Sequence, residues 1–107
     1  MKNLSPKTYI GNENMSEKAY LKAGFYSKPN TYDMSFYIYK DIVKAAISID
    51  KEDFEMSVDI THNDNMFAPF YNPDDRHNNM VYEKSVKEYN RQMDALVKKG
   101  VLICEDN

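Results

Sequence analysis

The 107-residue sequence has a single cysteine, Cys104, so no disulfide bond can form within the chain. It has only three glycines and no P-loop, GxGxxG or CxxC motif, which argues against a glycine-rich phosphate-binding loop. No run of about 18 apolar residues is present, so we expect no membrane-spanning helix. Residues 1–14 also lack the apolar segment of a secretory signal. Together with the one free thiol, these absences favour a protein of a reducing cytoplasm.

Charge is unevenly distributed along the chain, whose net charge is −3. Residues 1–30 carry five lysines and two glutamates, and residues 80–107 carry five bases and five acids. Residues 31–79 carry ten acids against four bases, which gives this middle segment a net charge of −6. Because phosphate binding needs the opposite sign, we do not expect the middle segment to bind nucleic acid directly.

Three consecutive segments alternate apolar and polar residues, which is typical of β-strands buried on one face. Their apolar positions are Tyr32, Met34, Phe36 and Ile38, then Val43, Ala45, Ile47 and Ile49, then Phe54, Met56, Val58 and Ile60. We therefore predict a single α+β domain over residues 1–107. Its sheet would be a three-stranded antiparallel β-meander at about 32–39, 42–50 and 54–61.

The numbering of the apolar positions restricts how these strands pair, because residues opposed across an antiparallel ladder share a face. The buried positions are odd-numbered in the second strand and even-numbered in the third, so the connecting loop must have an even length. Pairing Ile49 with Phe54 leaves a four-residue loop of residues 50–53, with Asp50 where type I turns favour it. The same rule places Ile38 opposite Val43 in the first hairpin.

Two helices are expected to flank the sheet. The first covers about 15–23, with Asn14 as its N-cap and Gly24 as the left-handed residue at its C-terminal end. The second covers about 80–99 and carries one apolar stripe, formed by Tyr82, Val86, Tyr89, Met93 and Leu96. We predict that this stripe covers the apolar face of the sheet and that residues 101–103 add a short strand.

The opposite, outer face of the predicted sheet is the principal candidate for a binding surface. Its predicted rows are Asp33–Ser48–Glu55, Ser35–Ala46–Ser57 and Tyr37–Lys44–Asp59, with Tyr39 beyond the last row. Tyrosines beside carboxylates suit protein docking, since tyrosine combines a large contact area with a hydroxyl. The alternative is an ordinary solvated face, or one covered by the N-terminal helix. The candidate partner-binding residues of this face are Asp33, Tyr37, Tyr39, Glu55 and Asp59.

The aperiodic segment 62–79 holds two further candidates. Its aromatic residues would either enter a pocket of a partner or close one end of the core; they are Phe67, Phe70 and Tyr71. A second group supplies ligand types found in metal or acid–base sites, although its spacing matches no known metal signature; it comprises His62, Asp64, Asp74, Asp75 and His77. Asn72 and Pro73 could instead open a capped helical turn within this segment.

These patterns favour a small, non-enzymatic inhibitor without a cofactor, which docks its acidic surface on the basic, nucleic-acid-binding surface of another protein. Small size, lack of catalytic motifs and a skewed residue usage point to a phage or mobile element, with a defence nuclease in the cytoplasm of a bacterial host as an example of the partner. The alternatives are a metal-binding protein or enzyme that uses the His62 group, and a single-stranded nucleic-acid binder that stacks bases on Tyr37 and Tyr39. A homodimer through the edge of strand 32–39 is a further alternative.

Overall fold

The computed structural model describes residues 5–105. Over that range the strands are β1 (Tyr9–Gly11), β2 (Tyr26–Ser27), β3 (Thr31–Tyr39), β4 (Val43–Asp50), β5 (Met56–His62), β6 (Asn65–Met66) and β7 (Leu102–Cys104). The α-helices are α1 (Glu17–Ala23) and α2 (Met80–Lys98), and two short 3-10 turns, η1 (Ala68–Phe70) and η2 (Pro73–Arg76), lie between β6 and α2. The α+β class is therefore confirmed. No helix in the described range is long and apolar enough to cross a membrane.

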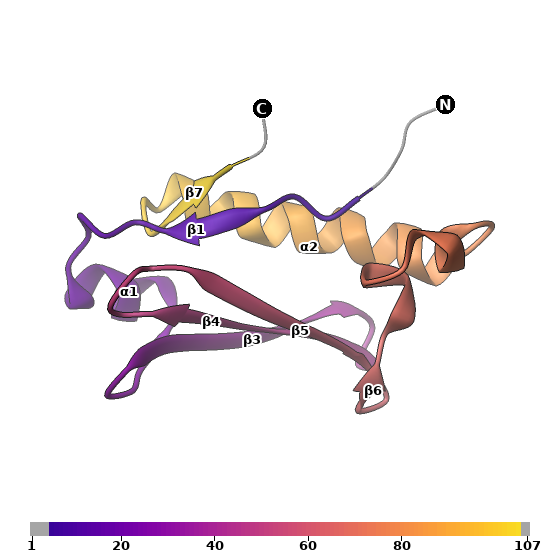
Figure 1. Cartoon of the computed structure of the whole chain (residues 1–107), viewed down its shortest axis with the longest axis horizontal. Coiled ribbons are helices and arrows are strands. Elements are labelled where there is room, and N and C mark those ends of the chain that lie inside the picture. The colour runs from indigo at the N-terminus through magenta and orange to yellow at the C-terminus, as the bar shows by residue number, and fades with distance from the viewer. Residues whose placement is uncertain (1–4, 106–107) are drawn as a thin grey trace.

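The elements form two layers (Figure 1). One layer is a five-stranded antiparallel sheet with the strand order β2-β3-β4-β5-β6. The second layer consists of α2 and an antiparallel two-stranded ribbon of β1 and β7, which lie side by side above the sheet. Helix α1 closes one end of the space between the layers. The opposite face of the sheet has no element over it among the described residues.

The prediction of a three-stranded meander was wrong in extent, because its three strands are the centre of a larger sheet. The β2 strand pairs with Tyr32 and Asp33 of β3, and β6 pairs with Thr61 and His62 of β5. Each added strand is two residues long, too short to produce a detectable alternation of apolar and polar residues. The short strand predicted at residues 101–103 is present as β7, but its partner β1 was missed, since Tyr9–Gly11 lies in a segment punctuated by Pro6 and Gly11.

The pairing of β3 with β4 has the predicted register as far as Tyr37, whereas the pairing of β4 with β5 keeps the predicted buried faces but is shifted by two residues. Ile49 lies opposite Met56, because Asp50 and Glu55 close the loop with a backbone hydrogen bond of 3.0 Å. The loop keeps four residues but is shifted by one, and Phe54 ends it with a positive φ of 60°. In the first hairpin, a bulge after Tyr37 places Tyr39 opposite Val43 in place of Ile38.

Helix α2 covers the sheet as predicted, and all five residues of its stripe are buried. Its first turn is capped by the Asn79 side chain, which accepts a hydrogen bond from the Tyr82 N–H. Helix α1 starts two residues later than predicted, with Ser16 in place of Asn14 as its N-cap, while Gly24 takes the expected left-handed conformation. Tyr20 of α1 is fully buried, and its ring stacks on Tyr32 at a centroid distance of 4.2 Å. Helix α1 therefore packs on the inner side of the sheet and leaves the outer face uncovered.

One polar group in this core has no partner. The Ser85 hydroxyl lies in α2, is completely buried, and makes no hydrogen bond with any described residue. Replacing Ser85 with alanine removes an unsatisfied hydroxyl and introduces the best helix former, so we expect the free energy of unfolding to rise by about 1 kcal/mol. Urea denaturation of both proteins measures this difference, and a destabilised Ser85→Ala protein would show that the hydroxyl is satisfied in solution.

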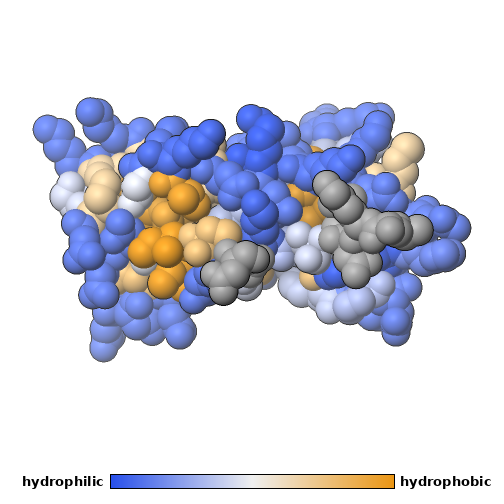
Figure 2. Space-filling view, turned by 90° about the horizontal axis from the view of Figure 1, so that it is seen from above, coloured by the Kyte–Doolittle hydropathy of each residue, from blue (hydrophilic) through white to orange (hydrophobic). Residues whose placement is uncertain are grey.

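The upper layer is mostly hydrophilic on its solvent side, and its apolar atoms gather mainly in a patch left of centre (Figure 2). In the β1–β7 ribbon, Ile10 lies opposite Ile103, and the Ile103 side chain is 44% exposed. The ribbon is tied to α2 through Asp94, which accepts hydrogen bonds from the Tyr9 hydroxyl at 2.9 Å and from Lys7 Nζ at 3.0 Å. These bonds connect residues more than 80 positions apart and position β1 beside α2.

Candidate functional site

The uncovered outer face of the sheet is the candidate site. Its observed rows are Asp33–Ser48–Ser57, Ser35–Ala46–Asp59 and Tyr37–Lys44–Thr61. The first two strands are aligned as predicted, and the third is shifted along its length by two residues. Asp59 therefore lies in the middle row, and Glu55 lies beyond the end of β5, next to the loop. The alternation of apolar and polar residues places all these polar side chains on one face.

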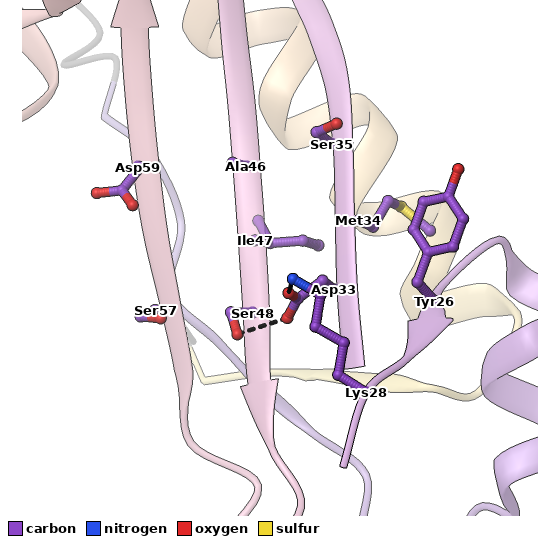
Figure 3. Close-up of a pocket in the computed structure, with 10 residues that line it drawn as sticks. All are labelled: Tyr26, Lys28, Asp33, Met34, Ser35, Ala46, Ile47, Ser48, Ser57 and Asp59. Carbon is purple, nitrogen blue, oxygen red and sulfur yellow. Dashed lines mark hydrogen bonds and ion pairs between the residues drawn. The ribbon is translucent and has the colours of Figure 1, made fainter. Parts of the chain in front are cut away.

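Two adjacent shallow depressions lie over the first two rows of this face and share Ser48 and Ser57. The larger has a volume of about 320 Å³ and contains Asp33 and Asp59, with Tyr26 and Lys28 of the β2 segment at its rim (Figure 3). The smaller is lined near the β4–β5 loop by three more carboxylates, those of Asp50, Asp53 and Glu55. Five carboxylates and one lysine therefore line the two depressions, which gives them a net negative charge.

Asp33 anchors the rim of the larger depression. Its carboxylate accepts a hydrogen bond from the Ser48 hydroxyl at 2.7 Å and forms an ion pair with Lys28 Nζ at 2.8 Å (Figure 3). Burial alone would raise the pKa of Asp33, but the hydrogen bonds from Lys28 and Ser48 outweigh it and hold the pKa below its ordinary value. Asp33 thus stays ionised and holds the β2 segment against the sheet.

Replacing Ser48 with alanine is expected to raise the pKa of Asp33 toward its ordinary value, because one donor to the carboxylate is lost. A carboxyl whose pKa is lower in the folded than in the unfolded chain stabilises the fold above the unfolded value of about 3.9. That contribution is lost as the pH falls through the folded pKa, so the variant should unfold in acid at a higher pH. A carboxyl carbon NMR titration gives the pKa. In the control Ser57→Ala the pKa of Asp33 should stay unchanged, and an equal shift in both variants would contradict the expectation.

The two tyrosines predicted for this face have different positions. Tyr37 is 52% exposed and lies opposite Lys44, at the end of the face far from the β4–β5 loop. Tyr39 follows the bulge and is partly buried against the core, so its predicted place on the outer face was wrong. The bulge inserts one residue into β3 and thereby reverses the face on which later side chains lie. Tyr26, which was not predicted, is 73% exposed at the rim of the larger depression.

The aromatic residues of the 62–79 segment lie mainly in the interior. Phe67 is buried, and the ring of Phe70 makes edge contacts with Tyr82 at 5.6 Å and Tyr89 at 5.7 Å. These two residues close one end of the core, which was the second of the two predicted roles. Tyr71 is half exposed, but its hydroxyl accepts a hydrogen bond from the Ile60 N–H at 2.8 Å. Of the three, Phe67 is buried, Phe70 is partly buried and Tyr71 is the most exposed.

The His62 group does not assemble into a site. Within residues 5–105, no three histidine, cysteine, aspartate or glutamate side chains are placed to hold one metal ion. Asn72 caps η2 by accepting a hydrogen bond from the Asp74 N–H, and Asp74 and Asp75 lie in its first turn, as the alternative prediction for this segment stated. His62 contacts Phe67 at a ring-centroid distance of 5.7 Å. The geometry therefore gives no support to metal or acid–base chemistry by this group.

Sequence reasoning missed the β2 contribution to the site. Tyr26 and Lys28 belong to a segment that reads as a break between elements because of Pro29. The ion pair of Lys28 with Asp33 could have identified them, but it can be recognised only when β2 is known to lie beside β3. Comparison of the chain with protein-family models, with curated proteins and with solved structures finds no significant match. The geometry and charge of the outer face are therefore the features that indicate a function.

Proposed function

We propose that this chain is a small, non-enzymatic protein-interaction module that docks the outer face of its sheet on a basic surface of another protein. The observation that carries the proposal is the open face itself, where five carboxylates and one lysine line two connected depressions. Opposite charge on a partner would steer the encounter and raise the association rate at low ionic strength.

The exposed tyrosines supply the contact area that charge alone does not give. Tyr26 and Tyr37 are both more than half exposed on β2 and β3, at the side of the acidic face. Tyrosine is enriched at protein interfaces because it buries a large rigid ring and still satisfies its hydroxyl. We assign these two residues as the aromatic contacts of the docking face.

The proposed setting is inhibition, by a protein of a phage or mobile element, of a bacterial defence nuclease. A nucleic-acid-binding cleft is lined by lysine and arginine, because it must neutralise phosphates. An acidic face of this kind has the same charge sign as the phosphate backbone and would compete with it for the cleft. This setting is proposed over that of an enzyme because residues 5–105 present an open acidic face and assemble no group of side chains that could hold a metal ion.

Reversing two carboxylates tests the proposal. The variant Glu55→Lys/Asp59→Lys is expected to weaken partner binding at least tenfold at about 150 mM salt, because two attractive charges become repulsive. Both residues are exposed and form no ion pair with a described residue, so thermal stability should change little. Asp33 is left unchanged, since its bonds to Ser48 and Lys28 make its substitution costly to the fold.

The matched control is Asp74→Lys/Asp75→Lys, which makes the same change of net charge on η2, outside both depressions. Tagged wild-type, variant and control proteins are used as bait in extract of the native cell, and captured proteins are quantified by mass spectrometry. A basic protein captured by wild type and control but lost with the variant supports the proposal. Capture of the same proteins by all three, or of no basic protein, overturns it.

A further inference from the structure

One side of the sheet keeps an open stretch of backbone. In β5, the Ile60 N–H donates to the Tyr71 hydroxyl, and the Ile60 carbonyl accepts from the Phe67 N–H at 2.9 Å. Both groups of Ile60 therefore point away from β4. Because this direction alternates along a strand, the N–H and C=O groups of Met56 and Val58 also point away from β4. No other described residue pairs with them.

The unpaired stretch of the β5 edge, called here the β5 opening, lies between Phe54 and Ile60, whose outward backbone groups are hydrogen-bonded within the chain. At one end, the Phe54 carbonyl accepts a hydrogen bond from the Gly11 N–H at 2.9 Å, and at the other end Ile60 is satisfied by Phe67 and Tyr71. The five residues between Phe54 and Ile60 bridge about 20 Å, which admits a partner strand of about five residues. Two N–H and two C=O groups are available in that opening.

The opposite edge of the sheet, formed by β2 and β3, has fewer backbone groups free to pair with an added strand. There β2 pairs with Tyr32 and Asp33 of β3, and the Tyr37 carbonyl accepts a hydrogen bond from the Gln92 side chain at 3.4 Å. A homodimer through strand 32–39, the further alternative named above, would have to displace β2 from Tyr32 and Asp33 to use the whole strand. The β5 opening is therefore the better place for a strand from outside the chain.

The charges beside the β5 opening determine which strand fits it. Glu55 and Asp59 are exposed on the outer-face side, two residues to either side of Ser57. A second copy paired antiparallel about Ser57 would place each Glu55 opposite an Asp59, and like charges directly opposed destabilise a ladder. Lysine or arginine at the same two positions of a partner strand would instead pair with both carboxylates.

We infer that the β5 edge binds an extended, basic segment of the partner by strand addition, with two lysine or arginine side chains four positions apart facing Glu55 and Asp59. Of the three residues between them, the middle one faces Ser57, and the two that face the partly buried Met56 and Val58 are expected to be apolar. Backbone hydrogen bonds would supply affinity, and the alternating side chains would supply specificity. This inference rests on the proposed function and specifies how the basic partner is held.

The test uses a disulfide-closed β-hairpin peptide whose free edge has the sequence KVSVK. The protein is titrated with it at about 50 mM salt, and amide hydrogen exchange is followed residue by residue by NMR. We expect the exchange of the Met56 and Val58 amides to slow at least tenfold at saturation. A peptide with N-methyl groups on both edge valines keeps the charge but loses the donors, so it should not slow them, and an EVSVE peptide should not bind.

The outcomes separate this inference from the proposed function. If the KVSVK peptide shifts resonances of Asp33 and Asp59 without slowing the exchange of Met56 and Val58, the partner binds over the face and strand addition is overturned. Equal effects of the N-methylated peptide also overturn strand addition and leave the acidic face as the site. If no peptide perturbs any residue of the outer face or of β5, both the inference and the proposed function are contradicted.

Discussion

Replacing Tyr89 with alanine is expected to lower the free energy of unfolding by about 4 kcal/mol. The side chain is 2% exposed and lies in the buried stripe of α2. Its ring makes edge contacts with Tyr9 at 6.5 Å and Phe70 at 5.7 Å, so it joins the β1–β7 ribbon, α2 and the 62–79 segment. Truncation would leave a cavity among all three, and the surrounding elements cannot collapse together to fill it. Urea denaturation followed by circular dichroism measures the loss.

Two controls make this expectation specific. Tyr89→Phe keeps the ring and its packing and should cost less than about 1 kcal/mol. Tyr37→Ala removes a tyrosine that is 52% exposed on the outer face, and its effect should stay within about 0.5 kcal/mol. If Tyr89→Ala unfolded at the same urea concentration as wild type, the packing of α2 against Tyr9 of the ribbon and Phe70 of the 62–79 segment would be wrong.

Replacing Gly11 with alanine is expected to cost about 3 kcal/mol, because the added methyl group has no space. A Cβ atom at this position would lie 2.6 Å from Ile49 Cγ2 and 3.1 Å from the Tyr20 hydroxyl oxygen. Ile49 is completely buried in a central strand and cannot move aside without disturbing both of its neighbours. The Gly11 N–H also bonds to the Phe54 carbonyl, so a shift of β1 would break that hydrogen bond.

A double-mutant cycle identifies the clash as the cause. In an Ile49→Ala background the nearest atom is gone, so Gly11→Ala should cost at least about 1 kcal/mol less than it does in the wild-type chain. The thermal unfolding of the four proteins, followed by calorimetry, gives the coupling. Purely additive costs would mean that β1 does not pack against Ile49 as described.

Local periodicity was enough to predict the central strands and the long helix. The alternation in residues 32–61 located β3, β4 and β5 to within about two residues, and the spacing of Tyr82 to Leu96 identified the buried stripe of α2. The odd or even numbering of the apolar positions also predicted which face of each strand is buried. This succeeds because a strand or helix that covers a core must repeat apolar residues at its own period.

The register and the site required contacts that the local pattern does not contain. The third strand is shifted because Phe54 adopts a positive φ and its ring packs near Tyr20, at a centroid distance of 6.3 Å. Nothing in the loop sequence indicates that an aromatic residue takes this conformation, which usually favours glycine or asparagine. The shift moved Asp59 to the middle of the outer face and Glu55 to its end.

The sequence by itself determined the α+β class, the inward and outward residues of three strands up to the bulge in β3, and the negative charge of the segment that contains them. Only the tertiary structure decided that α1 packs inside, that Tyr39 turns toward the core, and that β2 and β6 cover parts of the sheet edges while Met56 and Val58 stay open. The physical reason is the distance along the sequence over which the determining interactions act. Periodicity is set by each residue and its near neighbours, whereas a free edge or an uncovered face depends on where segments distant in sequence come to rest.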